Sequence, residues 1–167
     1  FIEAGKLLKE MNVNVQLYLV GSIDNNNPSS MQEYEITNAV EKGYIQALGH
    51  REDIANCYKK AHIACLPSYR EGLPKSLIEA SACGLPIITT DVPGCRQIIH
   101  EGCNGILVPV KNSIALANAI KKLALDYDMM CSMGKESRRI AEEKYSHSTI
   151  IDSFFRIYNT NDLRNSK

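Results

Sequence analysis

Two glutamates, Glu71 and Glu79, stand eight positions apart in the stretch YREGLPKSLIEASACGLP, which runs from residue 69 to residue 86. Glu71 precedes a glycine, and Glu79 lies inside a run whose apolar residues have helical spacing. A carboxylate accepts two hydrogen bonds at once, so each glutamate is suited to hold two neighbouring hydroxyls of a ribose or a hexose. The pair therefore indicates a site that binds molecules with neighbouring hydroxyl groups.

A helix is predicted over residues 74–83, directly after the first glutamate. Pro74 fits the first position of a helix, where a missing N–H costs nothing. The free N–H groups and the dipole of that helix end favour an anion such as phosphate, Gly72 allows close backbone approach, and Lys75 adds a positive charge. Helical side chains lean toward the amino end, so Glu79 can point back to the same place.

A less specific interpretation stays open for the same residues. Glu71 can stabilise the helix amino end by its charge alone. Glu79 can pair with Lys75 on a solvated face, an arrangement worth only about 0.5 kcal/mol. Spacing alone does not decide between the two interpretations.

Short β-rich runs alternate with amphipathic helical patterns along the whole chain. Strands are predicted at residues 13–21, 43–49, 62–68, 86–91 and 105–109. Helices are predicted at residues 1–11, 30–42, 51–60, 74–83, 95–101, 113–125 and 128–157. Apolar strands separated by helices predict an α/β fold with a doubly wound parallel sheet, Rossmann-like. Ligands of such sheets bind beyond the carboxyl ends of the strands, which is where the glutamate stretch lies.

Length and composition limit the class of protein. The 167 residues are expected to form one domain. Nineteen Lys and Arg balance 19 Asp and Glu, so no global charge draws the chain to nucleic acid or to an anionic membrane. Six cysteines without a C-x-x-C pair predict reduced thiols in a cytoplasmic protein. No run approaches the roughly 20 apolar residues of a membrane span.

The ends of the chain and one insert are expected to differ from this pattern. The Asn-rich segment 21–30 is predicted to be a loop, and the polar segment 158–167 a flexible tail after a domain of residues 1–157. The chain begins at Phe1, already in a helical pattern, which favours a piece excised from a longer protein.

The run LPSYREGLPKSLIEASACGLPIITTDVPGCRQII closely resembles the E-x7-E region of family 4 glycosyltransferases, which have the two-domain GT-B architecture. LYLVG, ALGHREDIANCYKKAHIACLPS and GCNGILVPVKNSIALANAIKKL resemble other parts of the nucleotide-binding half of the same family. The resemblance covers residues 1 to about 157. It implies that this chain is the C-terminal half of a GT-B enzyme, and that the acceptor-binding N-terminal domain is absent.

The resemblance assigns roles to individual residues of the stretch. Glu71 matches the first glutamate of the E-x7-E motif, which contacts the donor sugar, with the backbone amides of Gly72 and Leu73 beside the sugar and the diphosphate. Glu79 matches the second, which binds the ribose hydroxyls of the nucleotide. Relatives supply an Arg and a Lys to the diphosphate from an earlier segment, and Lys75 is not their equivalent.

Three further residues are assigned to the donor site by the resemblance. Gly21, at the tip of the first strand, matches a glycine that lets backbone approach the donor. His50 and Arg51 lie where relatives have a loop whose main-chain groups read the base. The alternative, that Arg51 and Asp53 only open a helix, stays open.

The residues after the fourth predicted strand are ambiguous. Asp91, Gly94 and Arg96 can face the same cleft, but the geometry of a turn explains the glycine equally well. Gln97 departs from relatives, which often have Glu there.

The resemblance also implies a reaction and its partners. A hexosyl or N-acetylhexosaminyl group would pass from a nucleoside-diphosphate sugar, UDP favoured, to a glycan or polyprenyl-linked acceptor with retention of configuration. Glu71 would position the sugar rather than attack it. The departing diphosphate would be stabilised by helix amides and cations, with no metal and no resident cofactor. The 167 residues alone would bind donor weakly and transfer nothing, and the complete protein would be cytoplasmic, with possible peripheral attachment to the membrane.

Two other functions fit the same pattern. A non-catalytic nucleotide-sugar-binding module would keep the helix amino end without needing Glu71. A UDP-sugar 2-epimerase on the same scaffold would need acid and base groups on both domains, and the E-x7-E context favours transfer over it.

Overall fold

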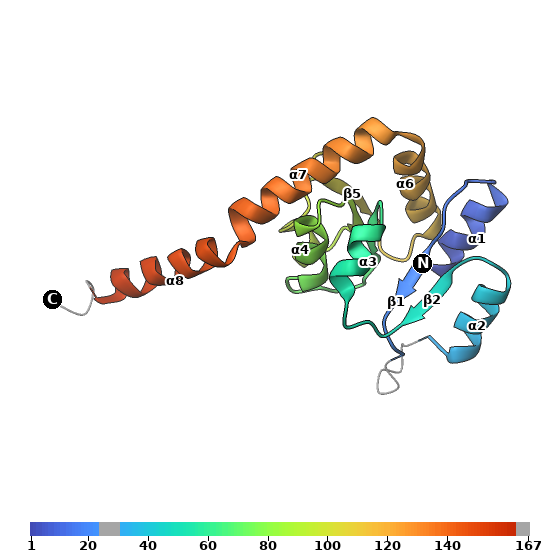
Figure 1. Ribbon diagram of the computed structural model, residues 1–167, viewed down its shortest axis with the longest axis horizontal. Helices are drawn as coiled ribbons and strands as arrows, with labels where there is room; N and C mark the ends of the chain where they lie inside the picture. The colour runs from blue at the N-terminus through green and yellow to red at the C-terminus, as the bar shows by residue number, and fades with distance from the viewer. Residues whose placement is uncertain (24–30, 163–167) are drawn as a thin grey trace.

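The computed structural model describes residues 1–23 and 31–162 and shows a layered α/β fold followed by a protruding C-terminal helix (Figure 1). The elements in chain order are α1 Ile2–Glu10, β1 Tyr18–Val20, α2 Glu33–Glu41, β2 Gln46–Gly49, α3 Ile54–Lys60, β3 Ala64–Leu66, α4 Lys75–Ala82, β4 Ile87–Thr90, α5 Pro93–Arg96, β5 Gly105–Val108, α6 Ser113–Leu125, α7 Tyr127–Tyr145 and α8 His147–Asp162. The predicted alternation of strands and helices is confirmed.

All described strand pairs are parallel, as predicted, but they form two sheets rather than one. β1 pairs with β2, and β3, β4 and β5 pair in that order. The strand predicted over residues 13–21 begins to pair only at Leu17, whose carbonyl accepts from the amide of Gln46 at 2.8 Å. Asn12 adopts a left-handed backbone (φ 52°), so the chain turns sharply after α1 before it becomes extended.

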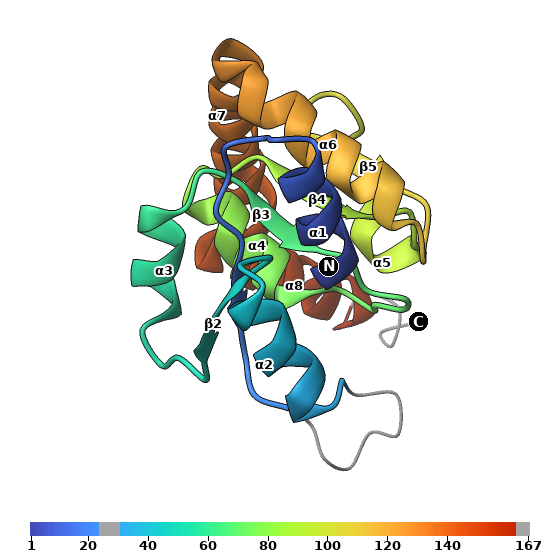
Figure 2. The same cartoon turned by 90° about the vertical axis from the view of Figure 1, so that its right-hand side faces the viewer.

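β4 is the central strand of the larger sheet, and every one of its residues is buried. Ile87 packs with Leu77 and Ala80 of α4 in one core, whereas Ile88 packs with residues of α1 and α6 in the other. Successive side chains of a strand point to opposite faces, so β4 contributes to both cores. The helices therefore cover both faces of this sheet, which is the doubly wound arrangement (Figure 2).

Two helices differ most from their predicted bounds, and for local reasons. The helix predicted over residues 95–101 is the four-residue α5, because the chain turns at Ile98 and the side chain of Asn104 accepts from the amide of His100 at 2.7 Å. The helical tract predicted over residues 128–157 is split at Ser146, whose backbone is extended and whose hydroxyl accepts from the amide of Thr149 at 3.3 Å. Ser146 therefore caps a new helix.

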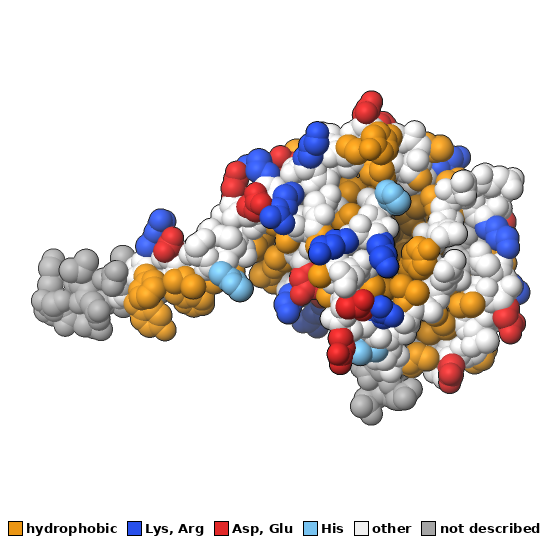
Figure 3. Space-filling view, in the orientation of Figure 1, with side chains coloured by type: hydrophobic (Ala, Val, Ile, Leu, Met, Phe, Trp, Pro, Cys, Tyr) orange, Lys and Arg blue, Asp and Glu red, His pale blue; other side chains and the backbone are white. Residues whose placement is uncertain are grey.

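Helix α8 continues from α7 and extends away from the sheets (Figure 1). Its exposed apolar side chains gather along one stretch of the surface (Figure 3), and they are Ile150, Ile151, Phe154, Phe155 and Tyr158. The predicted tail begins inside this helix, since 158–162 are its last residues, and 163–167 lie outside the described residues, as do residues 24–30 of the predicted loop. Within the described ranges, no helix combines the length and apolar character that crossing a bilayer requires.

Asn104 provides a test of how the turn after α5 is held before β5 begins. Its buried side chain accepts from the amide of His100 and donates to the carbonyl of Ile98 at 3.1 Å. Asn104→Ala leaves both backbone groups without these partners, so we expect the free energy of unfolding to fall by about 2–3 kcal/mol. Urea unfolding followed by circular dichroism measures it. Asn118→Ala, on the exposed face of α6, is the matched control, and an equal effect of both substitutions would contradict this role of Asn104.

Candidate functional site

The β3–α4 loop, residues 67–74, carries the first glutamate at the carboxyl end of β3. Glu71 is half-buried, Gly72 and Leu73 are exposed, and Pro74 is the N-cap of α4. A side chain at Gly72 would meet no atom within 4 Å, so the backbone is open on that side. The structure thus places Glu71 directly before a free helix amino end, as the sequence predicts.

Two threonines at the end of β4 hold the start of this loop. The hydroxyl of Thr89 donates to the carbonyl of Leu66 at 2.7 Å, and the hydroxyl of Thr90 donates to the carbonyl of Ser68. Both threonines are buried, so these bonds are shielded from water. The loop therefore leaves β3 along a path that the neighbouring strand sets.

Glu71 lies close to α5. Burial raises the pKa of the Cys95 thiol, and the negative charge of Glu71 raises it further. The backbone of Glu71 also lies against Gly94. The backbone of Glu71 is therefore packed against α5, while Glu71 as a whole remains partly exposed to solvent.

Helix α4 places Glu79 one turn after Lys75. Lys75 Nζ lies 3.4 Å from Glu79 Oε1, with side chains 88% and 36% exposed, so the ion pair considered as the alternative interpretation is present. A pair this exposed is worth at most about 0.5 kcal/mol. Glu79 can therefore exchange this partner for a ligand at little cost.

Tyr58 joins α3 to α4, the helix that carries the second glutamate. Its hydroxyl donates to the carbonyl of Ser76, in the first turn of α4, at 3.1 Å. Burial raises the pKa of Tyr58 to about 12, with a further contribution from the charge of Glu79. Glu79 consequently lies on the side of α4 that α3 covers, and the two helices lie side by side in Figures 1 and 2.

The tips of β1 and β2 carry the other predicted site residues. Gly21, with φ 135°, donates its amide to the carbonyl of Gly49 at 2.9 Å, which places it beside His50. Gly49 also has a left-handed backbone (φ 64°), a conformation that favours glycine. Gly21 and His50 are thus brought together, on the smaller sheet, while the residues from 71 to 79 follow the larger one.

Arg51 is engaged with Asp53 at the start of α3. Its Nε and Nη2 donate to the two carboxylate oxygens at 2.8 and 2.9 Å, and this pairing lowers the pKa of Asp53. Asp53 is the N-cap residue of α3 but its side chain caps no amide of that helix. Both residues therefore stand at the start of a helix, as in the alternative interpretation, and His50 and Arg51 are exposed residues. The helix rises by only about 7.5 Å from Asp53 to Tyr58, the residue that contacts α4. The loop with His50 and Arg51 therefore lies near α4.

Sequence reasoning missed Lys111, which follows β5. Its Nζ lies 5.3 Å from the centre of the exposed Tyr69 ring, a cation–π contact that brings the β5 tip to the β3–α4 loop. Lys111 has a left-handed backbone (φ 57°), but no pattern in the sequence links it to a residue 42 positions earlier. Only the parallel pairing of β3, β4 and β5 makes the two meet.

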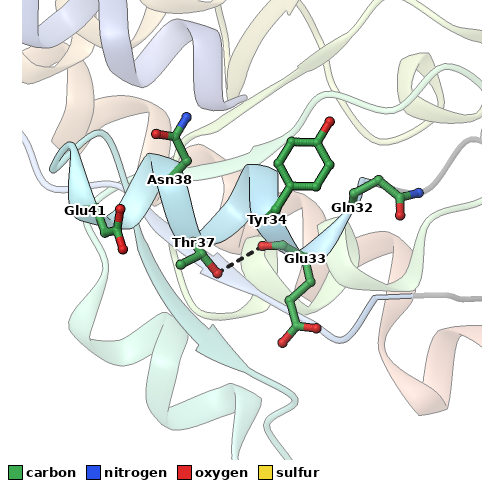
Figure 4. Close-up of a pocket in the computed structure, with 6 residues that line it drawn as sticks. All are labelled: Gln32, Glu33, Tyr34, Thr37, Asn38 and Glu41. Carbon is green, nitrogen blue, oxygen red and sulfur yellow. Dashed lines mark hydrogen bonds between the residues drawn. The ribbon is translucent and has the colours of Figure 1, made fainter.

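A hollow of about 550 Å³ lies elsewhere, along α2 (Figure 4), and it is lined by Gln32, Glu33, Tyr34, Thr37, Asn38 and Glu41. All six residues come from α2 or its N-cap, and their side chains spread along the helix rather than converging on one point. We therefore assign the site to the strand tips and not to this hollow. Within residues 1–23 and 31–162, no three His, Cys, Asp or Glu side chains cluster as a metal site would require.

Comparison with known proteins decides the family. The sequence model of the family described as "Glycosyl transferases group 1" matches residues 1–126. The chain belongs to the group 1 glycosyltransferases. A curated member, N,N'-diacetylbacillosaminyl-diphospho-undecaprenol alpha-1,3-N-acetylgalactosaminyltransferase of Campylobacter jejuni, is 30% identical over 158 residues, which are 95% of this chain and 40% of that enzyme.

Solved structures of glycosyltransferases share the fold. Sucrose-phosphate synthase of Thermosynechococcus elongatus superimposes with a TM-score of 0.79 at 27% identity, over 96% of this chain and 42% of that one. A pneumococcal O-GlcNAc transferase, in complex with UDP and GlcNAc, gives a TM-score of 0.73 at 28% identity, over 95% of this chain and 31% of that one. The Rossmann-like fold predicted for half of a GT-B glycosyltransferase is confirmed. The chain spans less than half the length of these three proteins.

Tyr58 provides a test of the packing of α3 against α4. Tyr58→Phe removes the hydroxyl that donates to Ser76, so we expect about 1 kcal/mol less stability at pH 7. Because the folded-state pKa of about 12 exceeds the usual value of 10, the wild-type advantage is complete below pH 10 and shrinks as the pH rises toward 12.

Urea unfolding of both proteins from pH 7 to pH 11 measures this difference. Tyr34→Phe is the control, because that side chain is 72% exposed on α2. A wild-type advantage that stays constant over this range would show that Tyr58 is not buried against α4.

Proposed function

We propose that this chain binds the nucleotide-sugar donor of a retaining glycosyltransferase, with UDP as the nucleotide. The observation that carries the proposal is the placement of Glu71 and Glu79 on either side of one free helix amino end, at the strand tips, in a chain of this family. The transferred group would be a hexosyl or N-acetylhexosaminyl group.

The two glutamates would hold different parts of the donor. Glu79, whose exposed ion pair with Lys75 is easily exchanged, would accept the two ribose hydroxyls. Glu71 would accept hydroxyls of the sugar, with the backbone amides of the exposed residues Gly72 and Leu73 beside the sugar and the diphosphate. The main chain of His50 and Arg51 would contact the base, and Gly21 would leave room for the donor at the tip of β1.

The chemical step would depend on stabilising the leaving group. The nucleoside diphosphate gains negative charge as its bond to the anomeric carbon breaks, and the first amides of α4 can donate to it. The acceptor would attack from the face that the diphosphate leaves, so configuration is retained. Glu71 would position the sugar and form no bond to it. This scheme uses no metal and no resident cofactor.

Two relatives support the choice of substrates. The pneumococcal structure at 28% identity was solved with UDP and GlcNAc. The Campylobacter enzyme is named for a diphospho-undecaprenol acceptor and an N-acetylgalactosaminyl donor group. We therefore propose a UDP-sugar as donor and a glycan or polyprenyl-linked molecule as acceptor for the complete protein.

The acceptor would bind outside residues 1–167. The chain spans 40% of the Campylobacter enzyme, so a second domain would supply both the acceptor site and the remaining cations for the diphosphate. This chain alone would then bind donor weakly and transfer nothing. The complete enzyme would work in the cytoplasm, at the membrane surface where a lipid-linked acceptor requires it.

Titration of the chain with UDP, GDP and ADP, followed by NMR chemical shifts, tests the proposal. We expect UDP to shift the amides of Gly21, His50, Gly72 and Glu79. Glu79→Ala removes hydrogen bonds to a charged group and should weaken UDP binding by about 10- to 100-fold.

Glu71→Ala should leave UDP binding nearly unchanged and remove the difference between UDP and a UDP-sugar. Glu142→Ala is the control, because Arg138 and Glu142 form an exposed pair of the same spacing on α7. Failure of all three nucleotides to bind at millimolar concentration, both to the chain and to the complete protein, would overturn the proposal.

A further inference from the structure

Gly94, the second residue of α5, lies against the backbone of the β3–α4 loop. It is buried, and its φ is not in the left-handed region, so its need for glycine is one of space rather than of backbone conformation. A Cβ atom at this position would lie 2.7 Å from the carbonyl carbon of Glu71 and still closer to the carbonyl oxygens of Glu71 and Gly72. The two segments are therefore in direct main-chain contact.

The α5 side of this contact is held firmly. Cys95 is fully buried, with its thiol 3.1 Å from the hydroxyl of Thr89, and Ile98 is fully buried after it. At the surface, Arg96 Nε donates to Asp91 at 2.5 Å and closes the turn between β4 and α5. Because these contacts fix α5, the loop and not α5 would have to move if Gly94 carried a side chain.

The loop side of the contact is held at one end by β4. The hydroxyl of Thr90 donates to the carbonyl of Ser68, three residues before Glu71. The loop is therefore held at Ser68 by Thr90 and at the carbonyl groups of Glu71 and Gly72 by the contact with Gly94. The end of β4 and the start of α5 together hold the backbone from which the Glu71 side chain extends.

We propose that Gly94 is a positioning residue that sets the place of Glu71, and with it the preference for a nucleotide sugar over the bare nucleotide. Thr90 performs the same task at the start of the loop. The inference rests on the proposed function, in which Glu71 holds the donor sugar and Glu79 holds the ribose. The sequence alone could explain Gly94 as a residue needed for a turn. The contact with Glu71 and Gly72 gives it a different role.

The size of the effect follows from the contact distance. To reach the 3.4 Å of an ordinary contact from 2.7 Å, the carbonyl carbon of Glu71 would have to move by about 0.7 Å, and the two carbonyl oxygens, which lie closer, would have to move further. Misplacement of a binding group by about 1 Å can cost up to about 100-fold in rate. The ribose contact of Glu79 lies further along α4 and would be affected much less.

The test compares Gly94→Ala with wild type by NMR and by titration with UDP and UDP-glucose or UDP-N-acetylglucosamine. In the free protein, we expect the amide signals of Glu71 and Gly72 to shift. We expect affinity for the preferred UDP-sugar to fall by about 10-fold while affinity for UDP changes by less than about threefold. In the complete enzyme, kcat/KM for the UDP-sugar should fall together with this affinity.

Gly134→Ala is the matched control. A Cβ at Gly134 would clash with the carbonyl oxygen of Gly84, so this substitution also crowds a buried glycine, but between α7 and the end of α4. It should lower stability without changing the signals of Glu71 or the preference between UDP and UDP-sugar. This control separates a loss of positioning from a general loss of stability.

Thr90→Val keeps the inference testable if Gly94→Ala does not fold. It removes the hydroxyl that donates to Ser68 at nearly constant volume, and we expect the same selective loss of UDP-sugar affinity, with Thr90→Ser restoring it. If Gly94→Ala and Thr90→Val both keep the wild-type preference for the UDP-sugar over UDP, this inference is overturned, while the proposed function is not. Absence of donor binding by the wild-type chain and the complete protein would instead overturn the proposed function.

Discussion

The buried central strand β4 is the constraint on which the rest of the structure depends. It pairs with a neighbour on each side, and its alternate side chains enter two separate cores. A strand that is buried on both faces has no polar side available to solvent, so the hydroxyls of Thr89 and Thr90 must find partners inside the protein. They find them in the carbonyls of Leu66 and Ser68, and this fixes how the chain leaves β3.

The candidate site is built from backbone held in place and from charges left free to change partner. The hydrogen bonds from the hydroxyls of Thr89 and Thr90 and the contact at Gly94 fix the backbone of the β3–α4 loop. The ion pairs of Lys75 with Glu79 and of Arg51 with Asp53 are exposed and individually weak. A ligand can displace such pairs at little cost, whereas it cannot move the buried framework. Rigid main chain and exchangeable side chains are the combination that a binding site for a charged, hydroxyl-rich molecule needs.

The two sheets are supported to different degrees. Every residue of β4 is buried, but all four residues of β2 are exposed, and α3 has no fully buried residue. The tips of β1 and β2 are shaped instead by the left-handed backbones of Gly21 and Gly49 and by one hydrogen bond between these residues. Motion is therefore expected first on the side that carries Gly21 and His50, because few buried contacts oppose it.

The sequence by itself determined the α/β class, the alternation of strands and helices, the two glutamates and the resemblance to glycosyltransferases, and it located the start of α4 to within one residue, since Pro74 is the N-cap and not the first helical residue. These features follow from periodicity, from the fixed φ of proline and from an ordered series of motifs, all of which are local. The tertiary structure alone decided that the strands form two sheets, that Arg51 pairs with Asp53, that Lys111 meets Tyr69, and that Gly94 is required by a contact with residues more than 20 positions earlier. Such contacts depend on how the strands align and on how closely helices pack, and no pattern within a single segment contains that information.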